Sequence, residues 1–345
     1  MSFSTLSEFL SVFERERDGL NAAAAATVRS LVAAALKIHR EIAFAPRDDL
    51  ATKGDTNVDG DVQRTLDILS DNLFLEAARS APVAIYASEE QEAPVPLNDG
   101  VPLALAIDPL DGSSNIDANI SIGTIFSILP VIGGREAEAS ILQPGNRQIA
   151  SGFFIYGPQF VLVLTMGRGT HGFVFSQATQ DFLLVHESLK IAPGAKEFAI
   201  NASNYRHWSD PVRSYVDDCL QGADGPRGKD FNMRWIASLV AETWRILVRG
   251  GVFLYPGDKR ANYAKGRLRL VYEANPIALL IEQAGGTATD TVTRILDIEP
   301  EHLHQRVPLV FGCADEVTRI ARHHTEFGGI ADRSPLFGNR GLFRT

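Results

Sequence analysis

The sequence predicts an α/β (α+β) protein that divides into two domains. Helical periodicity dominates the N-terminal stretch. Residues 120–185 read mostly as strands separated by Gly and Pro turns, and strands alternate with helices beyond residue 194. With 345 residues, 45% of them hydrophobic, the chain can form more than one core. We expect an N-terminal domain over 1–192, a C-terminal domain over 193–335 and a tail over 336–345.

Capping residues and the spacing of apolar residues predict three helices in the N-terminal part of the chain. Thr5-Leu6-Ser7-Glu8 is a capping box that predicts a first helix, and a second helix is expected from about Asn21. Residues 43–58 are rich in turn formers and are expected to form a loop. A third helix is expected to open near Gly60, with Asp61 at its N-cap. Its apolar positions are Val62, Leu66, Leu69 and Leu73.

Two short strands follow, at 84–87 and 103–107, and each ends in acidic residues. In the C-terminal half we expect strands at 198–200 and 251–255. Helices are expected at 210–220, 238–248 and 276–284, the last closed by Gly285-Gly286.

The most informative segment is Asp108-Pro109-Leu110-Asp111-Gly112-Ser113-Ser114-Asn115, directly after the second of these strands. Asp108 and Asp111 supply the hard oxygen ligands that Mg²⁺ prefers. Gly112 and the two serines let backbone N–H groups and hydroxyls approach a phosphate closely. An Asx-type turn is the alternative, and the paired aspartates favour a cation site beside an anion site over it.

Other acids stand near the ends of neighbouring elements. Adjacent residues in extended backbone point to opposite sides, so we expect only one of Glu89 and Glu90 to bind metal, with the other facing a water or a supporting group. Asp61 and Asp67 would lie about 120° apart on one helix and cannot share a narrow face. For that pair alone, an N-cap and a solvated acid are the simpler interpretation.

A basic cluster lies in the last third of the chain. The alternation Arg267-Leu268-Arg269-Leu270 predicts a strand with one cationic face, and Glu273 falls on the same parity. This set suits a phosphorylated, hydroxylated ligand and a further metal contact. A charged edge strand is one alternative, and a nucleic-acid surface that includes Tyr255 and Tyr263 is another.

Composition narrows the function classes. The formal net charge of −9 argues against nucleic-acid binding. The N-terminus lacks a signal-peptide pattern, and the longest uncharged run, 118–134, alternates like a strand, so no membrane partner is expected. Cys219 and Cys313 lie far apart, which favours a cytoplasmic protein without a disulfide framework. The eight histidines form no triad-like or zinc-like arrangement.

Taken together, these motifs resemble class I fructose-1,6-bisphosphatases, in family order over roughly residues 20–325. The matching segments are Asn57-Val58, Ser88-Glu89-Glu90, 108–117, Ser121-Ile122-Gly123-Thr124-Ile125-Phe126, Gln143-Pro144-Gly145, 250–256, Tyr272-Glu273-Ala274-Asn275-Pro276 and His304-Gln305-Arg306-Val307-Pro308. Asp-Pro-Leu-Asp-Gly alone is shared with inositol monophosphatases, and the other segments narrow the match. The resemblance implies a layered α/β/α/β/α sugar-phosphatase fold and a homotetramer.

The resemblance also implies roles for individual residues. Two or more Mg²⁺ ions per subunit, with Mn²⁺ as a substitute, would be held by Glu89, Asp108, the Leu110 carbonyl, Asp111 and Glu273. Asp67 and Glu90 would orient or deprotonate the attacking water, with Asp61 near the metals. The 1-phosphate would be held by Asp111, Gly112, Ser113 and Ser114. The sugar and far phosphate would be held by Asn201, Tyr205, Tyr255, Arg267 and, from a neighbouring subunit, Arg234.

The chain departs from the family pattern at three places. Arg267 stands where the family usually has Lys, and Trp235 where it has Tyr. Pro102-Leu103 replaces a Lys-Tyr pair that many relatives use to bind inhibitory AMP. We therefore expect a degenerate allosteric region.

The expected activity is hydrolysis of fructose 1,6-bisphosphate to fructose 6-phosphate and phosphate, in gluconeogenesis or the Calvin cycle. A sedoheptulose-1,7-bisphosphatase, or a dual enzyme, is the first alternative, and an inositol- or nucleotide-type monophosphatase the second. A non-catalytic sugar-phosphate-binding regulator is a third. The acidic set argues against the regulator, because a pure binder has no use for so many carboxylates around a polyanion.

Overall fold

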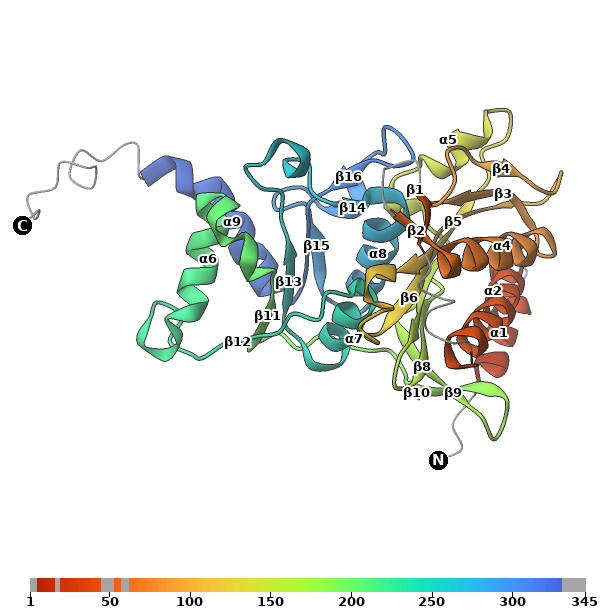
Figure 1. Cartoon of the computed structure of the whole chain (residues 1–345), viewed down its shortest axis with the longest axis horizontal. Coiled ribbons are helices and arrows are strands. Elements are labelled where there is room, and N and C mark those ends of the chain that lie inside the picture. The colour runs from red at the N-terminus through yellow and green to blue at the C-terminus, as the bar shows by residue number, and fades with distance from the viewer. Residues whose placement is uncertain (1–4, 16–18, 45–52, 57–61, 331–345) are drawn as a thin grey trace, which may run out of the picture.

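Five alternating layers of helix and sheet make up the fold, which confirms the predicted α/β/α/β/α architecture (Figure 1). The computed structural model describes residues 5–15, 19–44, 53–56 and 62–330. The outer helices are α1 (Leu6–Glu14), α2 (Gly19–Phe44) and α4 (Thr65–Arg79), the central ones α7 (Leu239–Arg249) and α8 (Asn275–Gln283), and those of the far layer α6 (Asp210–Leu220) and α9 (Ala314–Ile330). A short α5 (Ala137–Ile141) precedes β7.

The first sheet has eight strands, and its topology places two strand ends together. In spatial order the strands are β10 (Asp181–His186), β9 (His171–Ser176), β8 (Phe160–Thr165), β7 (Ala150–Tyr156), β6 (Ile122–Pro130), β5 (Leu103–Asp111), β3 (Val83–Ser88) and β4 (Val95–Pro96). Neighbours pair antiparallel except β3 and β5, which run parallel. The carboxyl ends of β3 and β5 therefore meet at one edge of the sheet.

The second sheet has five strands. In spatial order they are β12 (Asn232–Met233), β11 (Glu197–Ala199), β13 (Val252–Tyr255), β17 (Leu309–Gly312) and β15 (Thr287–Thr289). β11 runs parallel to both of its neighbours, and the other pairs are antiparallel. Two small ribbons pair β1 (Lys53–Thr56) with β2 (Val62–Arg64) and β14 (Leu268–Arg269) with β16 (Arg306–Val307).

Strand β6 is buried on both faces, which explains its nearly continuous apolar sequence. Phe126 and Ile128 join the core beneath the outer helices, whereas Ile125 joins the core around α7 and α8. Because side chains alternate between the two faces of a strand, β6 contributes residues to the cores on both of its sides.

Helix α2 has the length and hydropathy of a membrane span, but the core helix of a soluble protein meets the same criterion. Val28, Leu31 and Ala35 on one face are fully buried in the first core. Its apolar face is thus used in packing against the rest of the domain.

Several local predictions are confirmed. The Thr5 hydroxyl accepts from the Glu8 N–H at 3.1 Å, and the Glu8 carboxylate accepts from the Thr5 N–H at 3.0 Å, which completes the capping box. α6 spans the predicted 210–220. Gly285 adopts φ +79° just after α8, as a helix-ending glycine does.

Three local predictions are wrong. The third helix begins at Thr65 and not near Gly60, because residues 62–64 pair with β1 instead, and β1 itself lies within the predicted 43–58 loop. α2 also continues to Phe44. The predicted strand from Arg267 has only two residues, Leu268 and Arg269, and then turns into a π-helical segment, Leu270–Ala274.

Candidate active site

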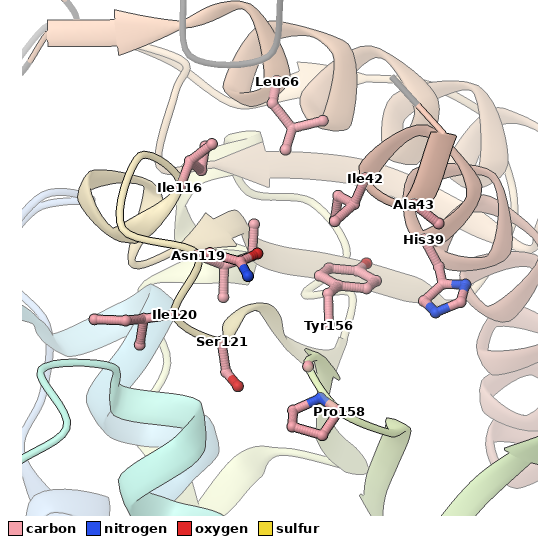
Figure 2. Close-up of a pocket in the computed structure, with 12 residues that line it drawn as sticks. His39, Ile42, Ala43, Leu66, Ile116, Asn119, Ile120, Ser121, Tyr156 and Pro158 are labelled. Atoms are coloured by element: carbon pink, nitrogen blue, oxygen red, sulfur yellow. The ribbon is translucent and has the colours of Figure 1, made fainter. Parts of the chain in front are cut away.

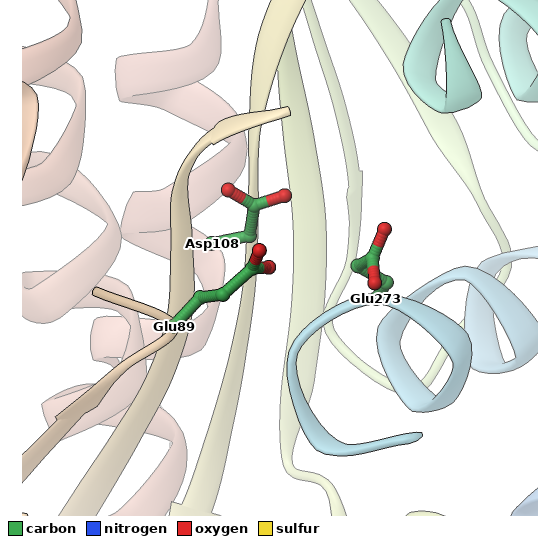
Figure 3. A group of neighbouring side chains, drawn as sticks. All are labelled: Glu89, Asp108 and Glu273. Atoms are coloured by element: carbon green, nitrogen blue, oxygen red, sulfur yellow. The ribbon is translucent and has the colours of Figure 1, made fainter. Parts of the chain in front are cut away.

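Three carboxylates from separate elements converge at the carboxyl ends of β3 and β5. One oxygen from each of Glu89, Asp108 and Glu273 lies within 4.8 Å of the others (Figure 3). Glu89 follows β3, and its N–H donates to the carbonyl of Ile107 on β5 at 3.0 Å. The parallel register that pairs Ser88 with Ile107 therefore brings Glu89 beside Asp108.

A bulge in β5 shapes the segment between the two aspartates. β5 pairs Asp108 with Ile125 and Asp111 with Gly123 on β6, so β5 contains one extra residue between these positions. Pro109 lacks an N–H and is tolerated at such a bulge. In a regular strand, residues three apart face opposite sides, and the extra residue changes that parity. The Leu110 N–H donates to Asp108 Oδ1 at 3.0 Å.

Glu273 reaches the cluster from the π-helical turn and not from a strand, so the parity argument for it was wrong. Arg269 was expected on the same face as Arg267, but its side chain is buried in the acidic cluster. Its Nη1 lies 2.7 Å from Glu89 Oε1, and its backbone N–H donates to Glu273 Oε2 at 2.5 Å. One guanidinium thus offsets part of the negative charge of the cluster.

The remaining negative charge perturbs the acids strongly. Burial, followed by the charges of Glu89, Asp111 and Glu273, raises the pKa of Asp108 well above its ordinary value, against the opposing effect of Arg269. Burial raises the pKa of Glu273 to about 7 despite Arg269. A divalent cation would relieve this repulsion, and carboxylate oxygens are its preferred ligands, so the cluster fits such a cation.

The turn after β5 is fixed by contacts with α7 and with the residues just before it. Burial raises the pKa of Asp111 to about 7, against a 3.1 Å hydrogen bond that Asp111 Oδ2 accepts from the Val240 N–H in the first turn of α7. Gly112 has φ +78°, a left-handed conformation that favours glycine. The Asn115 side chain donates to the carbonyl of Ala237 at 2.8 Å. Ser113 is half-buried and Ser114 exposed, so both can meet a ligand.

A group of aromatic and cationic side chains lies near the acids. The Arg267 guanidinium stands 4.4 Å from the Tyr263 ring centroid and 5.9 Å from that of Tyr255. Trp235 contacts Tyr255 at 5.8 Å between ring centroids. Burial raises the pKa of Tyr255, Arg267 lowers it, and the Glu273 charge raises it, so this group lies within electrostatic range of the acids.

The other predicted substrate residues contact groups of their own chain. Tyr205 donates to both oxygens of Asp217, at 3.0 and 3.1 Å. Asn201 Oδ1 accepts from the Ser203 hydroxyl at 2.6 Å. Arg234 is about half exposed at the end of edge strand β12, with its Nε 3.7 Å from Glu197.

Two of the three acids predicted to act on the attacking water or to lie near the metals are among the described residues. Asp67 lies in the first turn of α4 and is 3% exposed. Glu90 follows Glu89 and is half-buried. Asp61 lies outside the described residues.

A cavity of about 420 Å³ is lined by residues of the 116–122 segment, the end of α2 and the end of β7 (Figure 2). His39, Leu66 and Tyr156 are among the residues that line it. Within the described part of the chain, its lining includes neither a carboxylate nor a lysine or arginine.

Sequence reasoning missed two groups that support the site. The Arg269 contact with Glu89 could not be inferred from an alternation that placed it on a ligand-facing strand. Asp71 is 4% exposed and lies one helical turn after Asp67, a spacing that could have suggested a shared face.

Two family models match the chain: the fructose-1,6-bisphosphatase N-terminal domain over residues 4–187 and the C-terminal domain over 191–325. The chain belongs to the fructose-1,6-bisphosphatase family. It is 57% identical over 348 aligned residues, covering 100% of both chains, to the class 1 fructose-1,6-bisphosphatase of Rhizobium meliloti (strain 1021). It is 53% identical over 333 residues to that of Methylorubrum populi, covering 96% of each chain.

A solved fructose-1,6-bisphosphatase has the same fold. The holo form of the Leishmania major enzyme superposes with a TM-score of 0.86 and 30% identity, covering 94% of this chain and 100% of that one. Membership in this family implies dependence on a divalent metal, for which the acidic cluster is the fitting site.

Proposed function

We propose that the protein hydrolyses the 1-phosphate of fructose 1,6-bisphosphate to give fructose 6-phosphate and phosphate, with Mg²⁺ as its cation and Mn²⁺ as a substitute. The observation that carries the proposal is the convergence of Glu89, Asp108 and Glu273 beside the turn that begins at Asp111, in a chain of this family. Glu89, Asp108, the Leu110 carbonyl, Asp111 and Glu273 would hold the cations. When bound, these would neutralise the phosphate oxygens and activate water.

The turn supplies the anion contacts in this mechanism. The positive φ of Gly112 turns the chain, so that the N–H groups and hydroxyls of Ser113 and Ser114 can face the 1-phosphate. Asp67 and Glu90 orient the water or take its proton, with Asp61 as a further acid near the metals.

The residues predicted to hold the sugar and the second phosphate favour a bisphosphate substrate over a monophosphate. Arg267, whose guanidinium lies 4.4 Å from the Tyr263 ring centroid and 5.9 Å from that of Tyr255, would supply a cation to the sugar and the far phosphate. Asn201 and Tyr205 complete the pocket, which requires Tyr205 to exchange its contact with Asp217 for the ligand. Arg234, exposed on the edge strand, contributes from a neighbouring subunit of a cytoplasmic homotetramer.

Arg267, in place of the lysine usual in the family, also favours a second candidate substrate. A planar guanidinium is wider than an ammonium and can donate two hydrogen bonds, so it could accept a longer sugar. Sedoheptulose 1,7-bisphosphate is therefore the second candidate substrate. Hydrolysis of fructose 1,6-bisphosphate fits gluconeogenesis or the Calvin cycle, whereas a dual enzyme acting on both substrates would serve carbon fixation.

Phosphate release from a panel of substrates tests the proposal. Fructose 1,6-bisphosphate, sedoheptulose 1,7-bisphosphate, inositol 1-phosphate and AMP would each be assayed with Mg²⁺ and with excess EDTA. We expect Mg²⁺-dependent release from the fructose substrate, abolished by EDTA. Release from inositol 1-phosphate alone would favour a monophosphatase, and release from none would favour a non-catalytic regulator.

A further inference from the structure

Hydrogen bonds at successive residues hold the backbone of the segment that carries Glu89 and Glu90. The Glu90 N–H donates to the Ser88 hydroxyl at 3.2 Å. The Gln91 N–H donates to the Ser88 carbonyl at 3.1 Å. These bonds, together with the Glu89 contact to β5, fix the backbone of a tight turn. Two further connections, to α4 and to the π-helical turn, determine where this turn lies in the molecule.

A buried carboxylate behind the turn provides the first of these connections. Asp71 on α4 accepts a hydrogen bond from the Tyr86 hydroxyl at 2.7 Å and another from Gln91 Nε2 at 2.6 Å, one on each oxygen. Tyr86 is fully buried. Hydrogen bonds to an ionised acceptor are stronger than neutral ones, and burial strengthens them further.

A histidine provides the second connection. His304 Nε2 lies 3.0 Å from the carbonyl of Gln91, to which it donates. The next residue, Gln305, accepts from the N–H of Leu270 at 2.7 Å, and Leu270 opens the π-helical turn that carries Glu273. The chain of contacts therefore runs from α4 through the Glu89–Glu90 turn to the element that supplies the third carboxylate.

We propose that Asp71, Tyr86, Gln91 and His304 are positioning residues that set the separation of Glu89 from Glu273 and of Glu90 from Asp67. This inference rests on the proposed function, because it concerns the same metal and water sites. Asp71 is the central member: it lies one helical turn from Asp67 and bonds the residue next to Glu90. Without this bracing, the three carboxylates would still be present but would no longer converge within 4.8 Å.

An exchange of donor and acceptor tests the proposal. Gln91→Glu places two carboxylates against each other, whereas the double variant Asp71→Asn with Gln91→Glu restores one donor facing one acceptor at unchanged net charge. We expect Gln91→Glu to weaken Mn²⁺ binding about tenfold or more, as loss of a group that orients a metal ligand does. The double variant should return to within about threefold of wild type on the same scale.

The readout is the Mn²⁺ dissociation constant, measured by electron paramagnetic resonance without substrate, together with kcat and KM. We expect kcat to fall with Mn²⁺ affinity while KM for the bisphosphate stays within about twofold, since the braced groups lie at the metal end. Added negative charge alone would tighten Mn²⁺ binding. Tighter or unchanged binding in Gln91→Glu, or a double variant no better than the single one, would overturn the proposal.

A matched tyrosine pair separates positioning from folding. Tyr86→Phe and Tyr215→Phe each remove a hydroxyl that a fully buried tyrosine donates to a carboxylate; Tyr215 donates to Glu316 at 3.0 Å, between α6 and α9. Both should lower the melting temperature, but only Tyr86→Phe should weaken Mn²⁺ binding. Equal Mn²⁺ affinities would refute the inference. A wild type that binds Mn²⁺ but hydrolyses no sugar bisphosphate would instead refute the proposed function.

Discussion

Asp108→Asn is expected to stabilise the metal-free protein while abolishing its catalysis. Asp108 is 5% exposed, and burial together with the like charges around it raises its pKa. Asparagine keeps an oxygen to accept from the Leu110 N–H and removes the charge. The gain arises because an uncompensated buried charge costs folding free energy until a cation binds.

The expected gain in the free energy of unfolding can be estimated from the distances between the carboxylates. Two unit charges 4.8 Å apart repel by about 3.5 kcal/mol at an effective dielectric constant of about 20. Proton uptake and Arg269 offset part of this, so we expect a gain of about 1–3 kcal/mol in the free energy of unfolding at pH 8. That corresponds to a rise of a few degrees in the melting temperature.

The pH dependence gives the sharper signature. Burial raises the pKa of Asp111 and of Glu273 to about 7, from ordinary values of 3.8 and 4.5, and raises that of Asp108 as well. The folded chain therefore retains protons that the unfolded chain has released, so the stability of metal-free wild type falls as pH rises from about 4 through about 7. The advantage of Asp108→Asn should grow over the same range.

Thermal unfolding in EDTA at pH 5, 6.5 and 8 measures the difference in stability between Asp108→Asn and wild type. A parallel series contains Mg²⁺. Glu242→Gln is the control, because Glu242 is fully buried but paired with Arg245 at 2.8 Å, and its loss should destabilise. If Asp108→Asn unfolds below wild type in EDTA at pH 8, or if its advantage is the same at pH 5 and pH 8, the electrostatic reasoning fails.

Three further predictions concern catalysis, assembly and regulation. Asp111→Asn should lower kcat at least about a hundredfold while still accepting from the Val240 N–H; steady-state kinetics showing a loss under tenfold would contradict its role. Arg234→Ala should raise KM far more than it lowers kcat, and mixing it with Asp111→Asn subunits should restore some activity. Hybrids that form without recovery would count against a contribution from a neighbouring subunit. AMP should inhibit about thirtyfold to thousandfold more weakly than at a Lys-Tyr site, because Pro102 has no cation and Leu103 is buried without a hydroxyl. Half-inhibition at low micromolar AMP would show that reading to be wrong.

The acidic strand ends could be predicted because their information is local. Glu89 follows the apolar strand β3, Asp108 follows the apolar residues of β5, and the parallel pairing of the two strands brings these acids together. The α6 helix and the Thr5 cap depend on neighbouring residues only, and both were predicted at the correct positions.

The errors occurred where pairing partners are distant in sequence. Residues 62–64 have helical apolar spacing with Leu66, but they form a strand because β1 supplies partners for their backbone. Glu273 was assigned by strand parity, whereas β14 pairs with β16 for only two residues before the π-helical turn begins. Periodicity along the chain contains no information on either partner.

The most direct test of the central claim is to follow both phosphates of fructose 1,6-bisphosphate by ³¹P nuclear magnetic resonance during turnover. With Mg²⁺ present, the 1-phosphate signal should convert to inorganic phosphate while the 6-phosphate signal persists, and excess EDTA should stop the conversion. Hydrolysis that continues in EDTA, or loss of the 6-phosphate first, would contradict a metal-dependent 1-phosphatase built on Glu89, Asp108 and Glu273.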